Sequence, residues 1–552
     1  MASSVPDEEK LISLYDSPSS SQPLLHKPSS HHSTEESISN SNPPAVDSDQ
    51  SQYLQIFYNH GHRPWKDLFY LVVFLLFVVL TFGFGIFVVA NSNPNYYNLS
   101  SYKYDYKSGS CVSQVLFPQF AWPLNISSSS DSSRFLRSLI WVLVVTLILS
   151  LPICFLVLLC LKRYTKQVVY TFIPLVVAFI VFFNLYWFVA CTVNQTCSTD
   201  FPLLYRILVL AFVFILIGVV VWIIVANWHR VELTIEIIGV ASNALSKNLG
   251  LFIALPFMTL CLVVYYAPIV VFLVFAKQNG KIISIESNGT YSCEWKQDSW
   301  VSAYFALGVV TMLWSLSSLL EAHVYVISAT VAQWYFTKDD TIPKKTIRSS
   351  LRNAFGPSSG TICASGLLIG VVRIVRSLID NAREEAIPGI VNRALQCCVN
   401  SCLSAVEFFN KFTIIFAAIT GEGYCTSARM TYDLLRRNLL STAIVETIST
   451  RLLAGIVFVA TAIYAVSTCA ILNAVTDLGG GCYLIGIAGW AVLFVVMGYA
   501  VYVLDNVIEA VYICYSIDRD KGEVFKPEVH DVYVQLPIRR KHSSLSYDPL
   551  VV

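Results

Sequence analysis

A succession of long apolar runs, which begins at residue 68 and continues almost to the end of the chain, restricts this sequence to one class of fold. The hydrocarbon core of a bilayer is about 30 Å thick, and a helix needs about 20 residues to cross it. Only helices and closed barrels satisfy their own backbone hydrogen bonds in lipid, and barrel strands are shorter than these runs. The sequence therefore predicts an all-α, polytopic bundle of transmembrane helices.

Ten of these runs are predicted to cross the membrane. Charged residues make up only 13% of the chain, against about 25% in soluble proteins. Two runs, 361–380 and 399–419, are weaker because charged residues interrupt them. Without these two the count is eight, and both ends of the chain still lie on one side. The stronger runs are 68–90, 138–161, 168–190, 203–226, 250–276, 302–335, 447–472 and 483–513.

Two independent patterns indicate how the helices are oriented. Every Asn-x-Ser/Thr sequence falls in a loop after the first, third or fifth span, so all of them lie on one face. The loops on the opposite face are rich in Lys and Arg, as cytosolic loops are. The outer loop 277–299 is a mild exception, because it carries three lysines. Both termini are therefore predicted to be cytosolic, and the predicted glycosylation sites are Asn98, Asn125, Asn194 and Asn288.

Four cysteines lie in the predicted outer loops, where an oxidising compartment allows three different pairings. The sequence does not choose among these pairings. Cys191 and Cys197 are the preferred pair because they are closest in sequence, and Cys111 and Cys293 are the other two. Free thiols are the alternative. Because the chain has no Cys-x-x-Cys spacing, no metal site is predicted, and no cofactor is expected.

The two polar ends of the chain are predicted to be tails outside a helical domain at 67–518. Residues 1–66 are rich in Ser, Pro and Asn and have too little apolar surface to fold alone, and residues 519–552 form the second tail. Two short stretches resemble sorting signals, Asp-Glu-Glu-Lys-Leu-Ile from Asp7 and Tyr-Asp-Pro-Leu from Tyr547. Such patterns often arise by chance, and if they act, sorting adaptors are partners of the tails.

The second half of the chain, from about residue 300 to 535, carries several stretches in an order typical of one family. They are Leu313-Trp-Ser-Leu through Thr330-Val-Ala-Gln-Trp-Tyr335, Gly360-Thr-Ile-Cys through Arg376-Ser-Leu-Ile, Tyr424-Cys-Thr-Ser-Ala-Arg-Met-Thr-Tyr-Asp-Leu-Leu-Arg-Arg-Asn438, and a last helix with Asp505 that runs into Asp518-Arg519-Asp520. In these stretches the chain resembles the choline transporter-like family, which includes the yeast pH-nine-sensitive protein. The first half resembles the family mainly in layout.

The resemblance implies about ten spans, cytosolic ends and transport of choline or a related organic cation. The membrane potential supplies about 2.3 kcal/mol per 100 mV to a monovalent cation, so facilitated uniport by alternating access suffices, and proton coupling stays an alternative. The plasma membrane is the predicted location, with endosomal or Golgi-network cycling if the sorting signals act. Membrane lipids are further expected partners.

Other classes of function are less well supported by the sequence. A net charge of +1 gives no field that would attract nucleic acid, and a phosphate-binding loop for ATP-driven pumping is absent. An enzyme is not expected, because His229 and His323 stand alone in the membrane region. A lipid scramblase or a trafficking scaffold is the alternative. A scramblase predicts a polar groove open to the bilayer, whereas a carrier predicts a closed central cavity lined by the sixth span.

The sixth span carries the best candidate for binding a quaternary ammonium group, which is recognised by aromatic faces together with a carboxylate. Its candidate residues share one helical face at spacings of four, three and four: Trp314, Ser318, Glu321 and Tyr325. An acid at this depth costs on the order of 2.5–3.5 kcal/mol, so Glu321 should face a cavity or a partner. Either Glu321 neutralises the substrate between the two aromatic residues, or it pairs with His323 or an arginine on another helix.

The last span carries a second set of acidic and aromatic residues on one face: Tyr502, Asp505, Glu509 and Tyr512. The favoured interpretation is structural, because Arg373 and Arg376 on the seventh span could neutralise both acids in a buried network. The alternative is a gate in which the pairing of these charges changes between inward-facing and outward-facing states.

Overall fold

The computed structural model describes residues 63–106, 109–113, 130–193, 197, 201–287, 290–337, 346–381, 390–476, 481–521 and 524–536. Nine helices within these residues are long and apolar enough to cross a membrane. The prediction of an all-α, multi-pass membrane protein is confirmed. The two weaker spans also qualify, since α9 and α10 each contain an apolar stretch of sufficient length.

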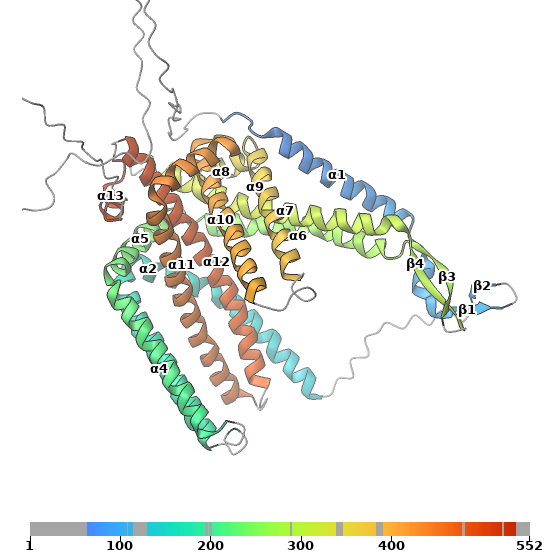
Figure 1. Cartoon of the computed structure of the whole chain (residues 1–552), viewed down its shortest axis with the longest axis horizontal. Helices are drawn as coiled ribbons and strands as arrows, with labels where there is room; N and C mark the ends of the chain where they lie inside the picture. Colours follow the sequence, from blue (N-terminus) through green and yellow to red (C-terminus); the bar gives the residue numbers. More distant parts are fainter. Residues whose placement is uncertain are drawn as a thin grey trace, which may run out of the picture.

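The elements follow in a simple order along the chain (Figure 1). They are α1 (Leu68–Ala90), the 3-10 helix η1 (Pro94–Ser101), β1 (Tyr102–Asp105), β2 (Ser110–Ser113), α2 (Ser130–Val193), α4 (Leu203–Ala226), α5 (Trp228–Lys247), α6 (Leu251–Ala276), β3 (Gly280–Ser287), β4 (Thr290–Gln297), α7 (Ser299–Tyr335), α8 (Thr346–Ala354), α9 (Ser359–Asn381), α10 (Ile390–Thr420), α11 (Tyr424–Val475), α12 (Gly481–Lys521) and α13 (Pro527–Tyr533).

Helix α2 accounts for two of the ten predicted spans. Its apolar part covers 60 residues, which at 1.5 Å per residue is about 90 Å, or three times the thickness of the hydrocarbon core. The helix breaks at Tyr164, where φ is −130° and ψ is 28°. The predicted spans 138–161 and 168–190 lie on either side of this break. Nine spanning helices therefore contain the ten predicted spans.

The bundle is organised around α7, which packs against α1, α6, α9, α10 and α12. Almost every residue in the second half of α7 is buried. Small residues in that half allow close approach of neighbouring helices. A Cβ atom at Gly366 of α9 would lie 2.3 Å from the Ser318 hydroxyl oxygen, so the two helices meet in direct contact there. At the periphery, the most apolar stretch of α4 contains no buried residue, as expected for a helix that faces lipid.

The helices converge at one end of the bundle and diverge at the other (Figure 1). Toward the divergent end, α1, α6 and α7 run away from α4, α11 and α12. We call the convergent end, which holds Arg63 and α13, the inner end, and the opposite end the outer end. The predicted orientation places the inner end in the cytosol.

Two antiparallel hairpins cover the outer ends of α1, α6 and α7, where the sequence predicted only loops. Strand β1 pairs with β2, with Tyr102 opposite Ser113. Strand β3 pairs with β4, with Gly280 opposite Gln297. A disulfide between Cys111 and Cys293 joins the two hairpins.

Residues beyond both predicted domain boundaries pack on the bundle. Arg63, which the prediction assigned to the N-terminal tail, is only 4% exposed. In the predicted C-terminal tail, α13 buries Val529 and Tyr533, and the Tyr533 hydroxyl donates a hydrogen bond to the Ile508 carbonyl (3.3 Å). Residues from both predicted tails are therefore part of the packed bundle.

Candidate functional site

Glu321 lies near the centre of the bundle and is 9% exposed. Ser365 of α9 and Asn410 of α10 flank its carboxyl group, and the charges of Arg373 and Lys411 act on it. Its Oε2 atom has no hydrogen-bond partner among the described residues. A buried carboxyl oxygen without a partner is costly in a bundle interior, and this makes Glu321 the strongest candidate there for binding a ligand.

Hydrogen bonds connect the surroundings of Glu321 across three helices. The Asn410 amide donates to the Ser365 hydroxyl (2.8 Å), and the Tyr424 hydroxyl donates to the Asn410 carbonyl oxygen (2.7 Å). Burial, followed by the charge of Glu321, raises the pKa of the Tyr424 phenol, so this group keeps its proton and acts as a donor. We call Glu321, Ser365, Asn410 and Tyr424 the central polar cluster.

The acids of α12 lie beside this cluster and share one lysine. The Lys411 ammonium lies 2.5 Å from Glu509 and 3.5 Å from Asp505. The Thr450 hydroxyl donates a further hydrogen bond to Asp505 (2.7 Å). Since Lys411 follows Asn410 directly, α10 presents an amide to Glu321 and an ammonium group to the α12 acids. We call Lys411, Asp505 and Glu509 the acid–lysine group.

The predicted pairing of the α12 acids with arginines of α9 is wrong. Arg376 instead pairs with Glu407 of α10 (3.1 Å), and the side chain of Arg373 is exposed. Lys411 is one of the charged residues that interrupt the weaker predicted span 399–419. A lysine within a span needs an acidic partner, and two acids one helical turn apart on α12 were the signal that could have identified the pair.

The predicted site residues on α7 are all buried, but they face different neighbours. The Trp314 indole donates to the Cys363 carbonyl (3.0 Å) and packs edge-on against Phe74, with ring centroids 5.3 Å apart. Tyr325 uses its hydroxyl to contact Arg63 and Ser358. Of the four predicted residues, only Glu321 belongs to the central polar cluster.

Two tyrosines outside α7 lie close enough to Glu321 for its charge to act on them. The Tyr424 hydroxyl is part of the central polar cluster. Tyr502 of α12 is subject to the charges of Glu321 and Lys411. The fourth residue of the predicted α12 set, Tyr512, lies within hydrogen-bond distance of the Thr442 hydroxyl (3.2 Å). The tyrosines on which the charge of Glu321 acts therefore belong to α11 and α12.

A groove of about 560 Å³ lies elsewhere, between α2, α4, α5 and α11. Aliphatic side chains and Phe172 form most of its lining, and its polar lining residues are Thr447 and Arg451. None of the residues in the central polar cluster or the acid–lysine group lines it. The apolar groove and the charged centre are thus separate features of the fold.

The predicted outer loops are only partly covered by the structure. Cys191 is joined to Cys197, and this connects the end of α2 to the segment before α4. Of the predicted glycosylation sites, Asn98 lies in η1, while its side chain and the whole of Asn125, Asn194 and Asn288 fall outside the described residues. Within the described ranges no group of three or more His, Cys, Asp or Glu residues is placed to hold a metal ion.

Comparison with known proteins identifies the sequence family. A family model described as plasma-membrane choline transporter matches residues 211–520, which include every residue of the central polar cluster and of the acid–lysine group. A CTL-like protein of Dictyostelium discoideum is 24% identical over 233 residues, which are 40% of this chain and 42% of that protein.

Two vertebrate relatives match over shorter stretches. Choline transporter-like protein 2 of Xenopus laevis is 33% identical over 127 residues, 22% of this chain and 18% of that protein. Choline transporter-like protein 4 of Homo sapiens is 27% identical over 154 residues, 26% of this chain and 22% of that protein. In each case the match spans less than half of the relative's length. Because the family model covers more than half of its 552 residues, the chain belongs to the plasma-membrane choline transporter family.

Proposed function

We propose that this protein carries choline or a similar organic cation across the membrane by alternating access. The observation that carries this proposal is the charge balance at the centre of the bundle. Three carboxyl groups, those of Glu321, Asp505 and Glu509, face the charges of Lys411 and, at Glu321, of Arg373, and Glu321 has an oxygen without a hydrogen-bond partner among the described residues. A centre with more carboxyl groups than cationic side chains is suited to receive a cation.

The chemistry of choline fits the kinds of side chain at this centre. A quaternary ammonium group donates no hydrogen bonds and cannot lose a proton, so aromatic faces and carboxylates are its natural partners. Each cation–π contact contributes about 0.5–2 kcal/mol. Glu321 is proposed as the carboxylate, with Tyr424 and Tyr502 as the aromatic residues near it in this conformation. Trp314, Ser318 and Tyr325 stay candidates for a different state of the carrier.

The acid–lysine group is proposed to change its pairing during the cycle. In the present conformation Lys411 pairs with both Glu509 and Asp505. A bound cation would compete with the lysine for these acids, because both carry one positive charge. This exchange would couple occupancy of the site to movement of α10 against α12.

The names of the relatives support the same substrate class, since several are called choline transporter-like proteins. The name of the family supports the plasma membrane as the location. The alternative function, a lipid scramblase, needs a polar path along the bilayer. The groove between α2, α4, α5 and α11 is apolar along most of its lining, so this groove does not provide such a path.

The test is uptake of labelled choline into liposomes that contain the purified full-length protein. We expect uptake to rise when a potential, negative inside, is imposed, and to fall at least tenfold in Glu321→Gln. Glu236→Gln is the matched control, because Glu236 forms a surface ion pair with Lys166 (3.3 Å) away from the centre. Uptake by Glu321→Gln at the control rate would remove Glu321 from the site, and no uptake by the unaltered protein would refute the proposed function.

A further inference from the structure

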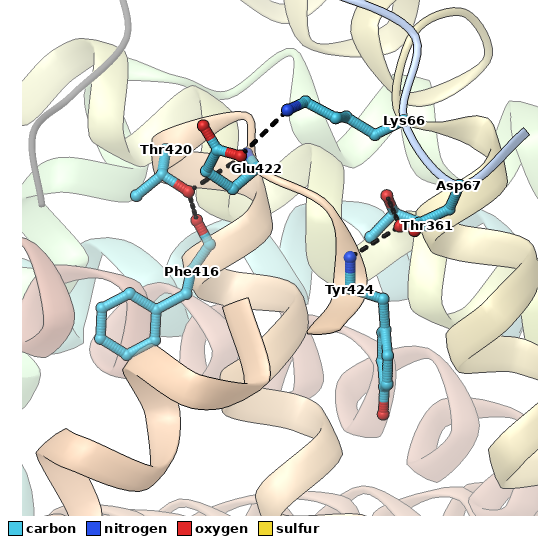
Figure 2. A network of polar contacts seen from close by, with 7 residues as sticks. All are labelled: Lys66, Asp67, Thr361, Phe416, Thr420, Glu422 and Tyr424. Carbon is cyan, nitrogen blue, oxygen red and sulfur yellow. Dashed lines mark hydrogen bonds and ion pairs between the residues drawn. The ribbon is translucent and has the colours of Figure 1, made fainter. Parts of the chain in front are cut away.

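The five residues that precede α1, Arg63–Asp67, lie across the inner end of the bundle without regular secondary structure, and Asp67 has a left-handed backbone with φ of 53°. We call this segment the N-terminal strap. It contacts α7, α9, α10 and the start of α11, and each of these helices contributes one residue to the central polar cluster. Figure 2 shows Lys66 and Asp67 of the strap facing Glu422, Thr361 and Tyr424 across this interface.

Arg63 fixes the strap to the end of α10. Its guanidinium group donates to the Tyr325 hydroxyl (2.5 Å) and to the carbonyl oxygens of Ala418 (2.9 Å) and Ile419 (3.4 Å). Helix α10 ends at Thr420, so these carbonyls belong to its last turn and carry the partial negative charge of a helix C-terminus. A buried arginine at this position satisfies both the free carbonyls and the dipole of α10.

Asp67 fixes the strap to the beginning of α11. Its Oδ2 atom accepts hydrogen bonds from the backbone N–H of Tyr424 (2.6 Å) and from the Thr361 hydroxyl (2.7 Å), as Figure 2 shows. Tyr424 is the first residue of α11, where free N–H groups carry partial positive charge. The strap therefore places a cation at the end of α10 and an anion at the start of α11.

Three glycines make room for the strap. A Cβ atom at Gly360 would lie 2.3 Å from the Asp67 carbonyl oxygen, and one at Gly423 would lie 3.1 Å from the Asp67 carboxylate. Gly421 has a φ of +75°, and a Cβ atom there would lie 3.2 Å from the Cδ atom of Arg63. The stretches that begin at Gly360 and Tyr424, which carry much of the family resemblance, thus meet at the strap.

The strap and the central polar cluster share a residue. The backbone N–H of Tyr424 donates a hydrogen bond to the Asp67 carboxylate, and its hydroxyl donates one to the Asn410 carbonyl oxygen. Tyr325, which binds Arg63, lies one helical turn beyond Glu321 on α7. Movement of the strap away from α11 would therefore disturb the hydrogen bonds around Glu321. Conversely, a ligand at Glu321 would change the contacts that Tyr424 and Tyr325 make with the strap.

We infer that the N-terminal strap is the inner gate of the transport path, closed in this conformation, and that Arg63 and Asp67 are its latching residues. The gating role rests on the proposed function, whereas the opening of the strap does not. In this proposal a cation at Glu321 leaves on the inner side past the break between α10 and α11, which the strap covers. Release of Arg63 and Asp67 opens that exit.

The first test measures opening without transport. Ser358 is 4% exposed and lies under Arg63, next to the Tyr325 hydroxyl (2.7 Å), so a thiol in Ser358→Cys reports access to the covered surface. In the full-length protein, we expect a water-soluble maleimide to modify this cysteine at least tenfold faster when Arg63→Gln or Asp67→Asn is added. Lys166→Gln, which breaks a surface ion pair elsewhere at the inner end, is the control. Equal rates of maleimide reaction in all variants would show that Arg63 and Asp67 do not hold the strap closed.

The second test locks the strap and measures flux. Lys66 and Glu422 form a half-exposed ion pair (3.1 Å), so Lys66→Cys with Glu422→Cys can be bridged by a short reagent that reacts with two thiols. We expect bridging to reduce choline uptake at least tenfold in the double variant and in neither single variant. Full flux after complete bridging would overturn the gate. If the unbridged protein moves no choline, the proposed function fails, and the maleimide rates still decide whether the strap opens.

Discussion

The inner end and the outer end of α1 are both attached to neighbouring helices, but through different kinds of contact. At the inner end, the strap uses one ion pair and several hydrogen bonds to helix ends, all of which water can replace. At the outer end, Val88 of α1 packs in a buried apolar cluster with Ala276, Val301 and Tyr304. There the segment after α1 is also linked covalently to β4 by the Cys111–Cys293 disulfide.

This difference indicates which end can move. Opening the outer end separates apolar surfaces and is limited by a covalent link, whereas opening the inner end exchanges polar contacts for hydration. The Asn279 amide adds a hydrogen bond to the Val88 carbonyl (3.1 Å), so the outer end is also tied through the backbone of α1. We therefore expect α1 to pivot about its outer end while the strap releases.

The largest effect is expected at the centre of the bundle, which both ends enclose. Lys411→Met removes the ammonium group between Asp505 and Glu509, whose side chains are 10% and 1% exposed. Breaking a buried ion pair on one side costs about 3–5 kcal/mol, because the remaining charge has no partner. We expect a large loss of thermal stability in detergent, and partial rescue when Glu509→Gln is added. Unchanged stability would mean that these acids are not ionised in the folded protein.

The sequence predicted the features that depend on local pattern and missed those that depend on which helices become neighbours. All ten spans followed from runs of apolar residues, since any helix must satisfy the same length requirement in lipid. The partner of Asp505 did not follow, because α9 and α10 both supply cations and only packing selects Lys411. Arg63 was assigned to a tail because a short stretch with charged residues before a span looks the same in sequence whether or not it binds a helix end.

The next largest effect on stability is expected when the disulfide at the outer end is removed. Cys111→Ser opens a link between residues 182 positions apart in the sequence. Loss of a native disulfide of this kind typically costs about 2–5 kcal/mol. We expect a lower Tm, while the rate of maleimide reaction at Ser358→Cys stays within twofold of the parent rate. A strong increase in that rate would show that the two ends of α1 are not independent.

A smaller effect is expected from the buried cation of the inner end. Arg63→Ala leaves the Tyr325 hydroxyl and the last carbonyls of α10 without their donor. Unsatisfied buried groups cost about 1–3 kcal/mol, so we expect a modest decrease in Tm. Arg63→Lys should recover part of it, because a lysine keeps the charge but not the forked geometry. Equal Tm values for Arg63→Ala and the parent would mean that the strap is already open in solution.

The smallest effect is expected at Lys66, and it sharpens the contrast within the strap itself. Lys66 and Glu422 are 35% and 39% exposed, so solvent screens their attraction and the pair should contribute about 0.2–1 kcal/mol. Lys66→Ala should therefore leave Tm nearly unchanged. The dependence of Tm on salt concentration should weaken only slightly. Since Asp67 lies next in sequence but contacts the N–H end of α11, Asp67→Asn should have the larger effect on maleimide access. If Lys66→Ala opened the strap as much as Asp67→Asn, charge at the surface rather than capping of the helix ends would hold the inner end closed.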